Sequence, residues 1–151
     1  MSQAQAKFPQ TVMSGNYAQF KHEFLELLFG VLVDERPIFG NDLDSLLVYT
    51  AISRHYLRDE RFGLSPDEDD VDQRGGLTAS KVAESTRLPR ETVRRKLHQL
   101  GSRGLLEKGP RDEWRVAVRD GQPVIRTQYS HEWQREMKRI VKFVRALKDH
   151  V

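Results

Sequence analysis

Apolar residues in the N-terminal part of the chain recur every three or four positions, which is the spacing of one face of an α-helix. Asn16 precedes the first of them as an N-cap, and Pro37 and Gly40 mark the end of the pattern. The sequence therefore predicts a first helix between these residues. Its apolar positions are Tyr17, Phe20, Phe24, Leu27, Leu28 and Val31.

A second helix is expected to begin after Asn41, because Asn41 and Asp44 resemble a capping box. Its apolar positions are Leu43, Leu46, Leu47, Ile52, Tyr56 and Leu57. The following stretch, GLSPDEDDVDQRGG, has no periodicity and is rich in glycine, proline and acidic residues. We therefore expect an N-terminal helical region over residues 1–62 and a flexible acidic linker over residues 63–76.

Residues 77–119 begin with two short helical patterns separated by a tight turn. Thr78 is a suitable N-cap for the first helix, and Val82 and Ala83 fall on one face of it. Leu88 lies in the turn, where it can fill the angle between the two helices. This order of elements is that of a helix-turn-helix.

The second of these helices has an apolar face and a polar face. The apolar face consists of Val93, Leu97 and Leu100, spaced i, i+4 and i+7, and Gly104 suits the position after its end. The opposite face carries Glu91, Arg95 and His98, flanked by Thr92 and Arg94. Such a surface can donate hydrogen bonds to guanine, accept them from cytosine and contact phosphates.

The residues that follow predict a β-hairpin. Leu105 and Leu106 enter a strand, residues 109–113 make a turn, and the next stretch alternates apolar and polar residues with the period of a half-buried strand. The alternating stretch is Trp114, Arg115, Val116, Ala117, Val118 and Arg119. A helix-turn-helix followed by such a hairpin, or wing, predicts a winged helix-turn-helix over residues 77–119.

The C-terminal segment, residues 120–151, is expected to contain a connection and then a long helix capped by Ser130. Apolar residues on that helix are spaced 4-3-4-3, like the seam of a coiled coil, and Val141 widens the stripe. The seam consists of Trp133, Met137, Ile140, Val144 and Leu147. It fits two arrangements, packing on the N-terminal helices of the same chain or on its copy in a homodimer.

The stretch LPRETVRRKLHQLGSRGLLEK resembles the winged helix-turn-helix of bacterial transcription regulators. Its R-E-T-V-x-R run is similar to the recognition helix of the cyclic-AMP receptor family. The stretch also resembles the IclR and MarR families, in which a similar helix leads into an R-G-L-type strand. The resemblance covers residues 77 to about 119 and implies a winged helix-turn-helix. Together with the helices that periodicity predicts on either side, the expected fold class is mainly α with a small β-hairpin wing, N-terminal helices and a long C-terminal helix.

By position, the resemblance implies that Arg90, Glu91 and Arg95 read bases, and we place Thr92 beside them. The residues expected to contact the DNA backbone or to lie on the wing are Lys81, Arg87, Arg94, His98, Lys108, Arg111 and Arg115. The chain departs from the pattern at Arg87, where a glycine is usual, and at Pro89, which supplies no capping oxygen. No cyclic-nucleotide β-barrel is visible upstream, so cyclic-nucleotide sensing is not implied.

Charge is divided unevenly along the chain. Residues 1–76 hold 7 basic and 13 acidic residues, whereas residues 77–151 hold 18 basic and 9 acidic residues. The basic half suits contact with phosphates, and the acidic half is kept off DNA. The sequence thus predicts a homodimeric, sequence-specific double-stranded DNA-binding protein that regulates transcription.

Other classes of function find little support in the sequence. Five scattered histidines and no cysteine give no metal-ligand spacing, and the acidic run 67–72 lacks the pattern of a calcium loop. No catalytic or phosphate-loop motif is present, and no cofactor is expected. No apolar run is long enough to span a membrane, and no signal peptide shows at Met1, so we expect a cytoplasmic protein.

The sequence also fits other interpretations. The winged-helix module can instead serve as a protein-interaction or scaffolding element. Glu91 can merely favour the helix N-terminus, and His98 can be an ordinary surface residue. A small-molecule effector pocket between the N-terminal helices and the winged domain is the alternative to plain core packing of four aromatic residues. These are Phe20, Phe24, Tyr49 and Tyr56.

Overall fold

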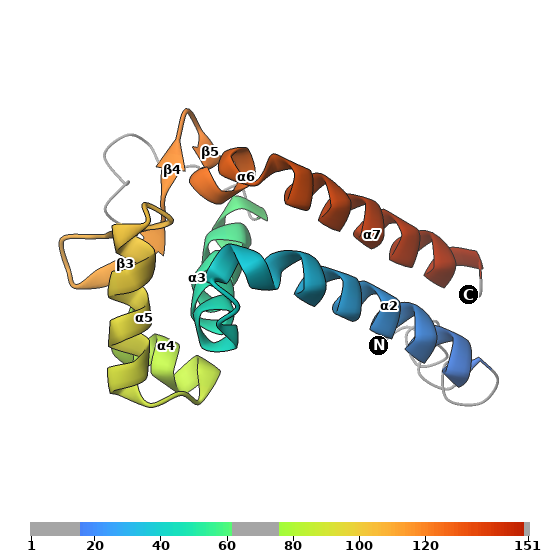
Figure 1. Ribbon diagram of the computed structural model, residues 1–151, viewed down its shortest axis with the longest axis horizontal. Helices are drawn as coiled ribbons and strands as arrows, with labels where there is room; N and C mark the ends of the chain where they lie inside the picture. Colours follow the sequence, from blue (N-terminus) through green and yellow to red (C-terminus); the bar gives the residue numbers. More distant parts are fainter. Residues whose placement is uncertain (1–15, 62–75, 150–151) are drawn as a thin grey trace. The chain divides into compact units, whose positions relative to one another are not determined.

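The structure is a computed structural model that describes residues 16–61 and 76–149. The chain divides into two compact units (Figure 1). One contains the N-terminal residues up to Pro37 and the C-terminal residues from His131, and the other spans Ile38–Ser130. The described part is mainly helical with a small antiparallel sheet, which confirms the coarse fold class expected from the sequence.

The first unit is a pair of long helices, α2 (Tyr17–Glu35) and α7 (Ser130–Asp149). They lie side by side and run in opposite directions (Figure 1). Asn16 precedes α2 as expected, but its side chain makes no capping hydrogen bond. Ser130 is the first residue of α7 rather than its cap.

A short 3-10 helix, η1 (Arg36–Phe39), spans the boundary between the two units, and α3 (Leu43–Arg61) is the first long helix of the second unit. Helix α4 (Ala79–Thr86) and helix α5 (Arg90–Ser102) follow, and α6 (Val124–Gln128) closes the unit. Strands β1 (Leu77–Thr78), β2 (Leu106–Lys108) and β3 (Glu113–Val116) form one sheet, and β4 (Val118–Arg119) and β5 (Gln122–Pro123) form another. No sequence pattern predicted η1, β1, β5 or α6.

Asp42, not Asn41, caps α3. The Oδ1 atom of Asp42 accepts hydrogen bonds from the backbone N–H groups of Asp44 and Ser45, at 3.0 and 3.4 Å. Asn41 has a left-handed backbone (φ 61°), directly after Gly40 (φ 64°). The expected capping box of Asn41 and Asp44 is therefore wrong by one residue, because Asn41 belongs to the turn that reverses the chain before the helix.

The sheet order is β1-β3-β2, and all pairings are antiparallel. Leu77 pairs with Trp114, and Leu106 pairs with Val116. The strand expected over residues 114–119 ends at Val116, and the alternation then slips, because Ala117 is buried while Val118 is exposed. The N–H group of Ala117 donates to the carbonyl of Leu105 at 3.0 Å, so the chain bends there and β4 pairs with β5 instead.

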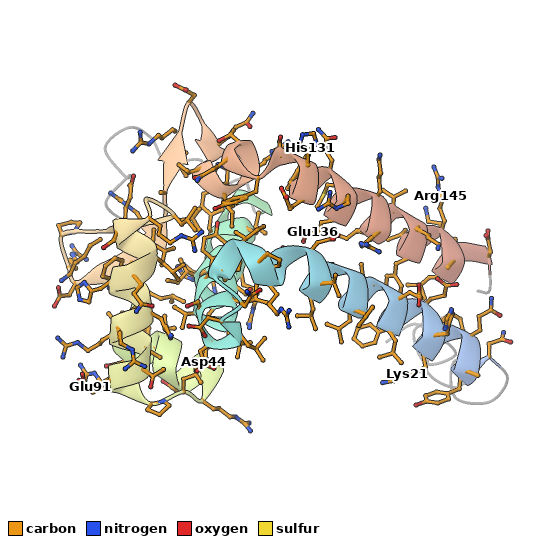
Figure 2. The ribbon with its side chains drawn as sticks, in the orientation of Figure 1. Lys21, Asp44, Glu91, His131, Glu136 and Arg145 are labelled. Atoms are coloured by element: carbon orange, nitrogen blue, oxygen red, sulfur yellow. The ribbon has the colours of Figure 1, made fainter. Side chains whose placement is uncertain are left out.

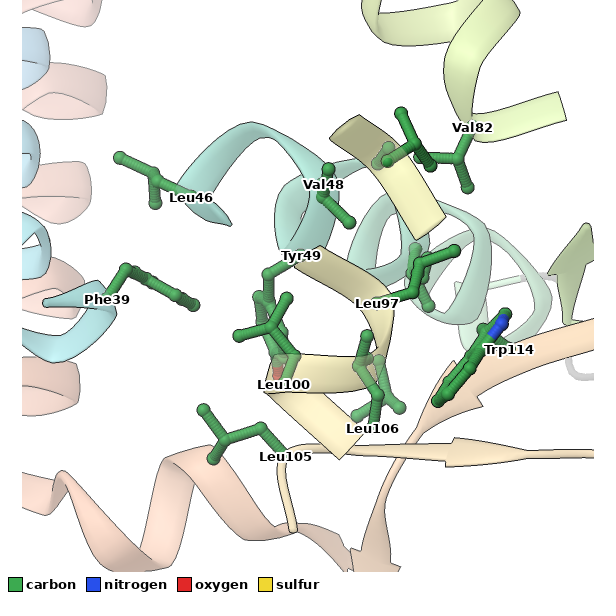
Figure 3. Close-up of a cluster of buried hydrophobic side chains, with 14 of the residues drawn as sticks. Phe39, Leu46, Val48, Tyr49, Val82, Leu97, Leu100, Leu105, Leu106 and Trp114 are labelled. Atoms are coloured by element: carbon green, nitrogen blue, oxygen red, sulfur yellow. The ribbon is translucent and has the colours of Figure 1, made fainter. Parts of the chain in front are cut away.

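One apolar core holds the second unit together. Its fully buried members come from α3, α4, α5 and the residue before β2, and Figure 3 shows Val48, Val82, Leu97, Leu100 and Leu105 among them. They are Ile52, Val48, Val82, Val93, Leu97, Leu100 and Leu105. Trp114 closes the core, and Gly101 gives its ring room, since a Cβ at position 101 would lie 2.8 Å from a ring carbon.

Helix α3 belongs to this core and not to a separate N-terminal region. Its buried residues include Leu46, Val48, Tyr49 and Ile52, whereas the expected core positions Leu43, Leu47 and Leu57 are exposed. The boundary expected at residue 62 therefore separates α3 from helices with which it shares a core. Most of the expected linker, residues 63–75, lies outside the described residues. Gly76, its last residue, passes close to the Trp114 backbone, where a Cβ would clash.

Candidate nucleic-acid interface

Helices α4 and α5 are joined by a short turn with defined capping interactions. Thr78 caps α4 as expected, because its Oγ1 atom accepts a hydrogen bond from the N–H of Lys81 at 3.3 Å. Arg87 ends the helix in the left-handed conformation (φ 59°), where a residue other than glycine costs on the order of 1 kcal/mol. Leu88 then packs partly buried against the core. The side chains of Lys81 and Arg87 remain exposed beside this turn.

Helix α5 separates apolar and charged side chains as the sequence predicted. Val93, Leu97 and Leu100 are fully buried, so the opposite face points to solvent. The exposed residues of that outer face are Arg90, Glu91, Arg94, Arg95 and His98, and Thr92 is half-buried beside them. Figure 2 shows Glu91 on the outer side of α5. Pro89 precedes the helix without a side-chain cap.

The cations of the outer face differ in their partners. Arg94 forms an exposed ion pair with Glu91, at 3.5 Å between Nη1 and Oε1. Arg90 and Arg95 form no ion pair with any other described residue. Within the described residues, no acidic side chain therefore engages these two guanidinium groups, whereas Arg94 and Glu91 partly satisfy each other.

The β2–β3 hairpin brings further cations to the same unit. Lys108 Nζ lies 2.9 Å from Asp112 Oδ1, and Arg115 Nε lies 3.9 Å from Glu107 Oε2. Arg111, in the turn of the hairpin, is exposed and has no ion-pair partner among the described residues. Among the cations of the hairpin, Arg111 is therefore the one best placed to bind an anionic ligand.

The hairpin and the outer face of α5 meet at His98. The imidazole ring stands edge-on to the Trp114 ring at 5.2 Å between centroids, and Lys108 Nζ lies 5.9 Å from the centre of the same tryptophan ring. The hydrogen bond and charge of Lys108 lower the pKa of Asp112, and the charges of Arg94 and His98 add to this. Cations of α5 and of the hairpin thus form one continuous surface around His98.

Asp42 and Lys96 make a contact that the sequence did not indicate. Lys96, half-buried on α5, binds the carboxylate of Asp42, which also caps α3. Partial burial raises the pKa of Asp42, but hydrogen bonds from Lys96 and Ser45 outweigh it and hold this pKa below its ordinary value. The contact ties the start of α3 to the middle of α5. No short-range pattern links residues so far apart in the chain.

The residues of the C-terminal seam lie in the other unit. Trp133, Met137 and Leu147 are half-buried, and Ile140 and Val144 are exposed. None of the residues of α7 is fully buried.

The four aromatic residues that could line an effector pocket belong to both units. Tyr49 is buried in the core, where its ring lies 5.3 Å from that of Phe39, and Tyr56 packs against the same core. Phe20 and Phe24 lie on α2. A surface groove of about 590 Å³ runs along α7, but none of these four residues lines it.

Metal binding and membrane insertion find no support within residues 16–61 and 76–149. No three histidine, aspartate or glutamate side chains there are grouped so that they could hold a metal ion. None of the helices in the same ranges combines the length and the apolar character needed to cross a membrane.

Comparisons with known proteins add no assignment. No protein-family model matches the chain, and neither the curated proteins nor the solved structures gave a significant match.

Proposed function

We propose that this chain is a sequence-specific double-stranded DNA-binding protein of the winged helix-turn-helix kind, which acts as a homodimeric transcription regulator in the cytoplasm. The observation that carries the proposal is the outer face of α5. That face is built on a fully buried inner face and presents Arg90 and Arg95 without acidic partners among the described residues.

In this proposal α5 is the recognition helix. The major groove is about 12 Å wide and accepts one α-helix. Arg90, Glu91 and Arg95 lie in the first two turns of α5, where side chains of recognition helices reach base edges. A guanidinium there can donate two hydrogen bonds to O6 and N7 of guanine. Glu91 would exchange its contact with Arg94 for a cytosine amino group.

The β2–β3 hairpin is the wing in this proposal. Lys108 and Arg111 provide sequence-independent contacts to phosphates, and Lys81 and Arg87 extend these contacts across the turn before α5. The junction at His98 and Trp114 supports this role, because it fixes the hairpin against the outer face of α5. A rigid junction keeps backbone and base contacts in register.

The experiment that tests the proposal is a selection of binding sites from a pool of randomised duplexes by the full chain. We expect enrichment of one motif containing guanine, arranged as two related half-sites. Fluorescence anisotropy should then give tighter binding to the selected duplex than to a scrambled duplex of equal length. Equal affinity for both would contradict sequence-specific recognition, and failure to bind either would favour a protein-interaction role.

A further inference from the structure

The pair of helices α2 and α7 has almost no interior of its own. Phe20 and Gly30 are the only buried residues of α2, and α7 has none. Stable packing of amphipathic helices requires that their apolar stripes be covered. A pair of helices with so little buried surface therefore requires another surface to pack on.

The contacts between the two helices show which faces meet. The ring of Phe143 lies 6.5 Å from that of Phe24, and Arg139 Nε lies 3.3 Å from Asp34 Oδ2. The Arg139 guanidinium also lies against Gly30, where any Cβ would clash with it. Glu136 lies between the helices and Arg145 points away from α2 (Figure 2).

On α7 the residues that contact α2 include Glu136, Arg139 and Phe143, and Met137, Ile140 and Val144 each come one position later. Consecutive side chains on an α-helix point about 100° apart around its axis. The two helices run in opposite directions, so these rotations are opposite when seen along one axis. The side chain that follows a contact residue therefore points to the same side of the helix pair on α2 and on α7. On α2 these positions are Leu28 and Val31, next to Leu27 and Gly30, and Phe24, whose ring lies at the edge of the contact with α7 because it also touches Phe143.

These six residues form one surface, which we call the α2–α7 apolar face. Four of them are substantially exposed, namely Phe24 (43%), Leu28 (42%), Ile140 (36%) and Val144 (42%). Val31 and Met137 are half-buried. The face thus combines three residues of the α7 seam, Met137, Ile140 and Val144, with an apolar stripe of α2 on the same side of the helix pair.

We propose that the α2–α7 apolar face binds the same face of a second copy of this chain, so that two helix pairs form a four-helix bundle. The inference deepens the homodimeric part of the proposed function, because it names the surface that joins the two chains. It does not depend on DNA binding.

The size of the face is sufficient for a dimer. A helix of 19 residues, the length of α2, is about 28 Å long, and two helices side by side are about 20 Å wide. The face therefore covers roughly 560 Å² on each chain, or roughly 1,100 Å² in total. Stable specific interfaces bury about 1,200–2,000 Å² in total, and about 1,000 Å² is the lower bound for a biological interface, so the face lies at the small end of the range.

Charge makes the helix pair complementary to itself. Helix α2 has four acidic residues and one lysine, a formal charge of −3 that becomes −2 when Glu35 is protonated, and α7 has six basic and three acidic residues, a formal charge of +3. When two copies pack about a two-fold axis with each α2 against the partner's α7, the helices alternate in sign around the bundle. An unrelated partner would need the same alternation by coincidence.

Sedimentation equilibrium of the full chain without nucleic acid tests the proposal. Leu28→Gln combined with Val144→Gln places two polar amides on the face without changing charge. The matched control is Leu25→Gln combined with Val33→Gln, which replaces somewhat more exposed residues (46% and 51%) on another side of α2. We expect a dimeric wild type, at least about hundredfold weaker association in the test pair, and a change of less than about threefold in the control.

Three outcomes would overturn the proposal. The first is a wild type that stays monomeric at its highest soluble concentration. Other residues of the same chain would then have to cover the α2–α7 apolar face. The second is a dimer that the control pair disrupts and the test pair does not. The third is a dimer that neither pair affects. Circular dichroism of each variant shows whether its helices are intact.

A less disruptive measurement covers the case in which the test pair does not fold. The chain has no cysteine, so Leu28→Cys and Leu25→Cys each introduce a single site for an environment-sensitive dye. Dilution of the dimer should shift the emission of the dye at position 28 to the red and leave that at position 25 unchanged. The opposite pattern, or equal shifts, would contradict burial of the α2–α7 apolar face.

Discussion

The three arginines of α5 differ in their ion-pair partners, and we expect them to differ in function for this reason. Arg94 is engaged by Glu91 on the exposed face, whereas Arg90 and Arg95 have no ion-pair partner among the described residues. An exposed ion pair contributes little to stability. In the proposed function we therefore expect the guanidinium groups of Arg90 and Arg95 to form the base contacts. We expect Arg111, on the hairpin, to contact only the DNA backbone.

Replacing Arg95 with alanine should relax the preference for one base pair in each half-site. A bidentate contact from arginine to guanine contributes about 1–3 kcal/mol of discrimination. Arg111→Ala is the matched control, because it should weaken binding to all sequences about equally. Binding-site selection on both variants measures the preference. An unchanged preferred site with uniformly lower affinity in Arg95→Ala would show that Arg95 binds a phosphate.

The Asp42 carboxylate combines two structural roles, so Asp42→Asn should destabilise the second unit by about 1–3 kcal/mol. Loss of the ion pair leaves half-buried Lys96 without its partner, and the amide is a weaker acceptor. Urea unfolding measures the change. Asp112→Asn, which breaks only an exposed pair, should change the free energy of unfolding much less than Asp42→Asn does.

The pH dependence of the Asp42 effect has a definite sign. The pKa of this carboxyl is below its ordinary value of 3.8 in the folded chain, so its stabilisation is complete above that value and is lost as the pH falls through the folded pKa. The difference between wild type and Asp42→Asn should therefore shrink below about pH 4. A difference that stays constant down to pH 2 would rule out the carboxylate as its source.

At the scale of elements, periodicity predicted the helices better than the strands. The spacing of Val93, Leu97 and Leu100 predicted which face of α5 is buried, because these three residues form its apolar stripe and the stripe must pack on the core. The outward face carrying Arg95 and His98 followed directly. The expected strand 114–119 failed because its second half bends at Ala117, where a hydrogen bond to Leu105 overrides the alternation.

Other features depend on contacts that no local pattern contains. The bond between Asp42 and Lys96 joins residues far apart in the chain, and β1 exists only because β3 pairs with it. Strands of two residues have too few positions for a period to show. The placement of α3 in the core with α4 and α5 has the same origin, since it depends on tertiary packing rather than on sequence order.

A carboxyl pair between α2 and α7 should make the helix pair sensitive to pH. Burial raises the pKa of Glu35 to about 8, and the charge and hydrogen bond of Glu136 and the charge of Asp34 contribute. Asp34 itself contacts Arg135 and Arg139, at 3.4 and 3.3 Å. The folded pKa is above the ordinary 4.5, so protonated Glu35 stabilises fully below about pH 4.5, and this stabilisation is lost as the pH rises through 8.

The variant Glu35→Gln should remove that dependence, because glutamine keeps a hydrogen-bond donor without a charge. Thermal unfolding followed by circular dichroism at pH 5, 7 and 9 compares it with wild type. We expect the wild type to lose stability across this range and the variant to lose less. Glu26→Gln, on the exposed surface of α2, should behave as wild type. A variant with the slope of the wild type would show that Glu35 does not titrate there.

At the scale of the whole molecule, the chain separates its basic and acidic residues. The C-terminal half holds twice as many basic as acidic residues, and the candidate interface lies within it. In the proposed function, counterion release governs the affinity for DNA. The proposed homodimer would present two such interfaces, and this would double the number of phosphates bound.

Binding to DNA should therefore weaken steeply with salt. We expect the logarithm of the association constant to fall with the logarithm of salt concentration with a slope of about −4 to −8 per dimer. Arg111→Ala should flatten the slope by about one unit for each phosphate that the variant no longer binds. Anisotropy titrations at several salt concentrations give the slope. Binding that does not depend on salt would contradict an electrostatic origin of the affinity.

The most direct test of the central claim, that the outer face of α5 binds DNA, compares two double variants with wild type on the selected duplex at one salt concentration. Arg90→Ala with Arg95→Ala removes the two cations of that face that lack partners among the described residues, and Arg54→Ala with Arg119→Ala removes equal charge elsewhere in the unit. Removal of two base contacts should weaken binding by about 2–6 kcal/mol, while the control should weaken it by less than about 1 kcal/mol, as expected for charges that touch no base. Equal weakening in the two variants would contradict the claim.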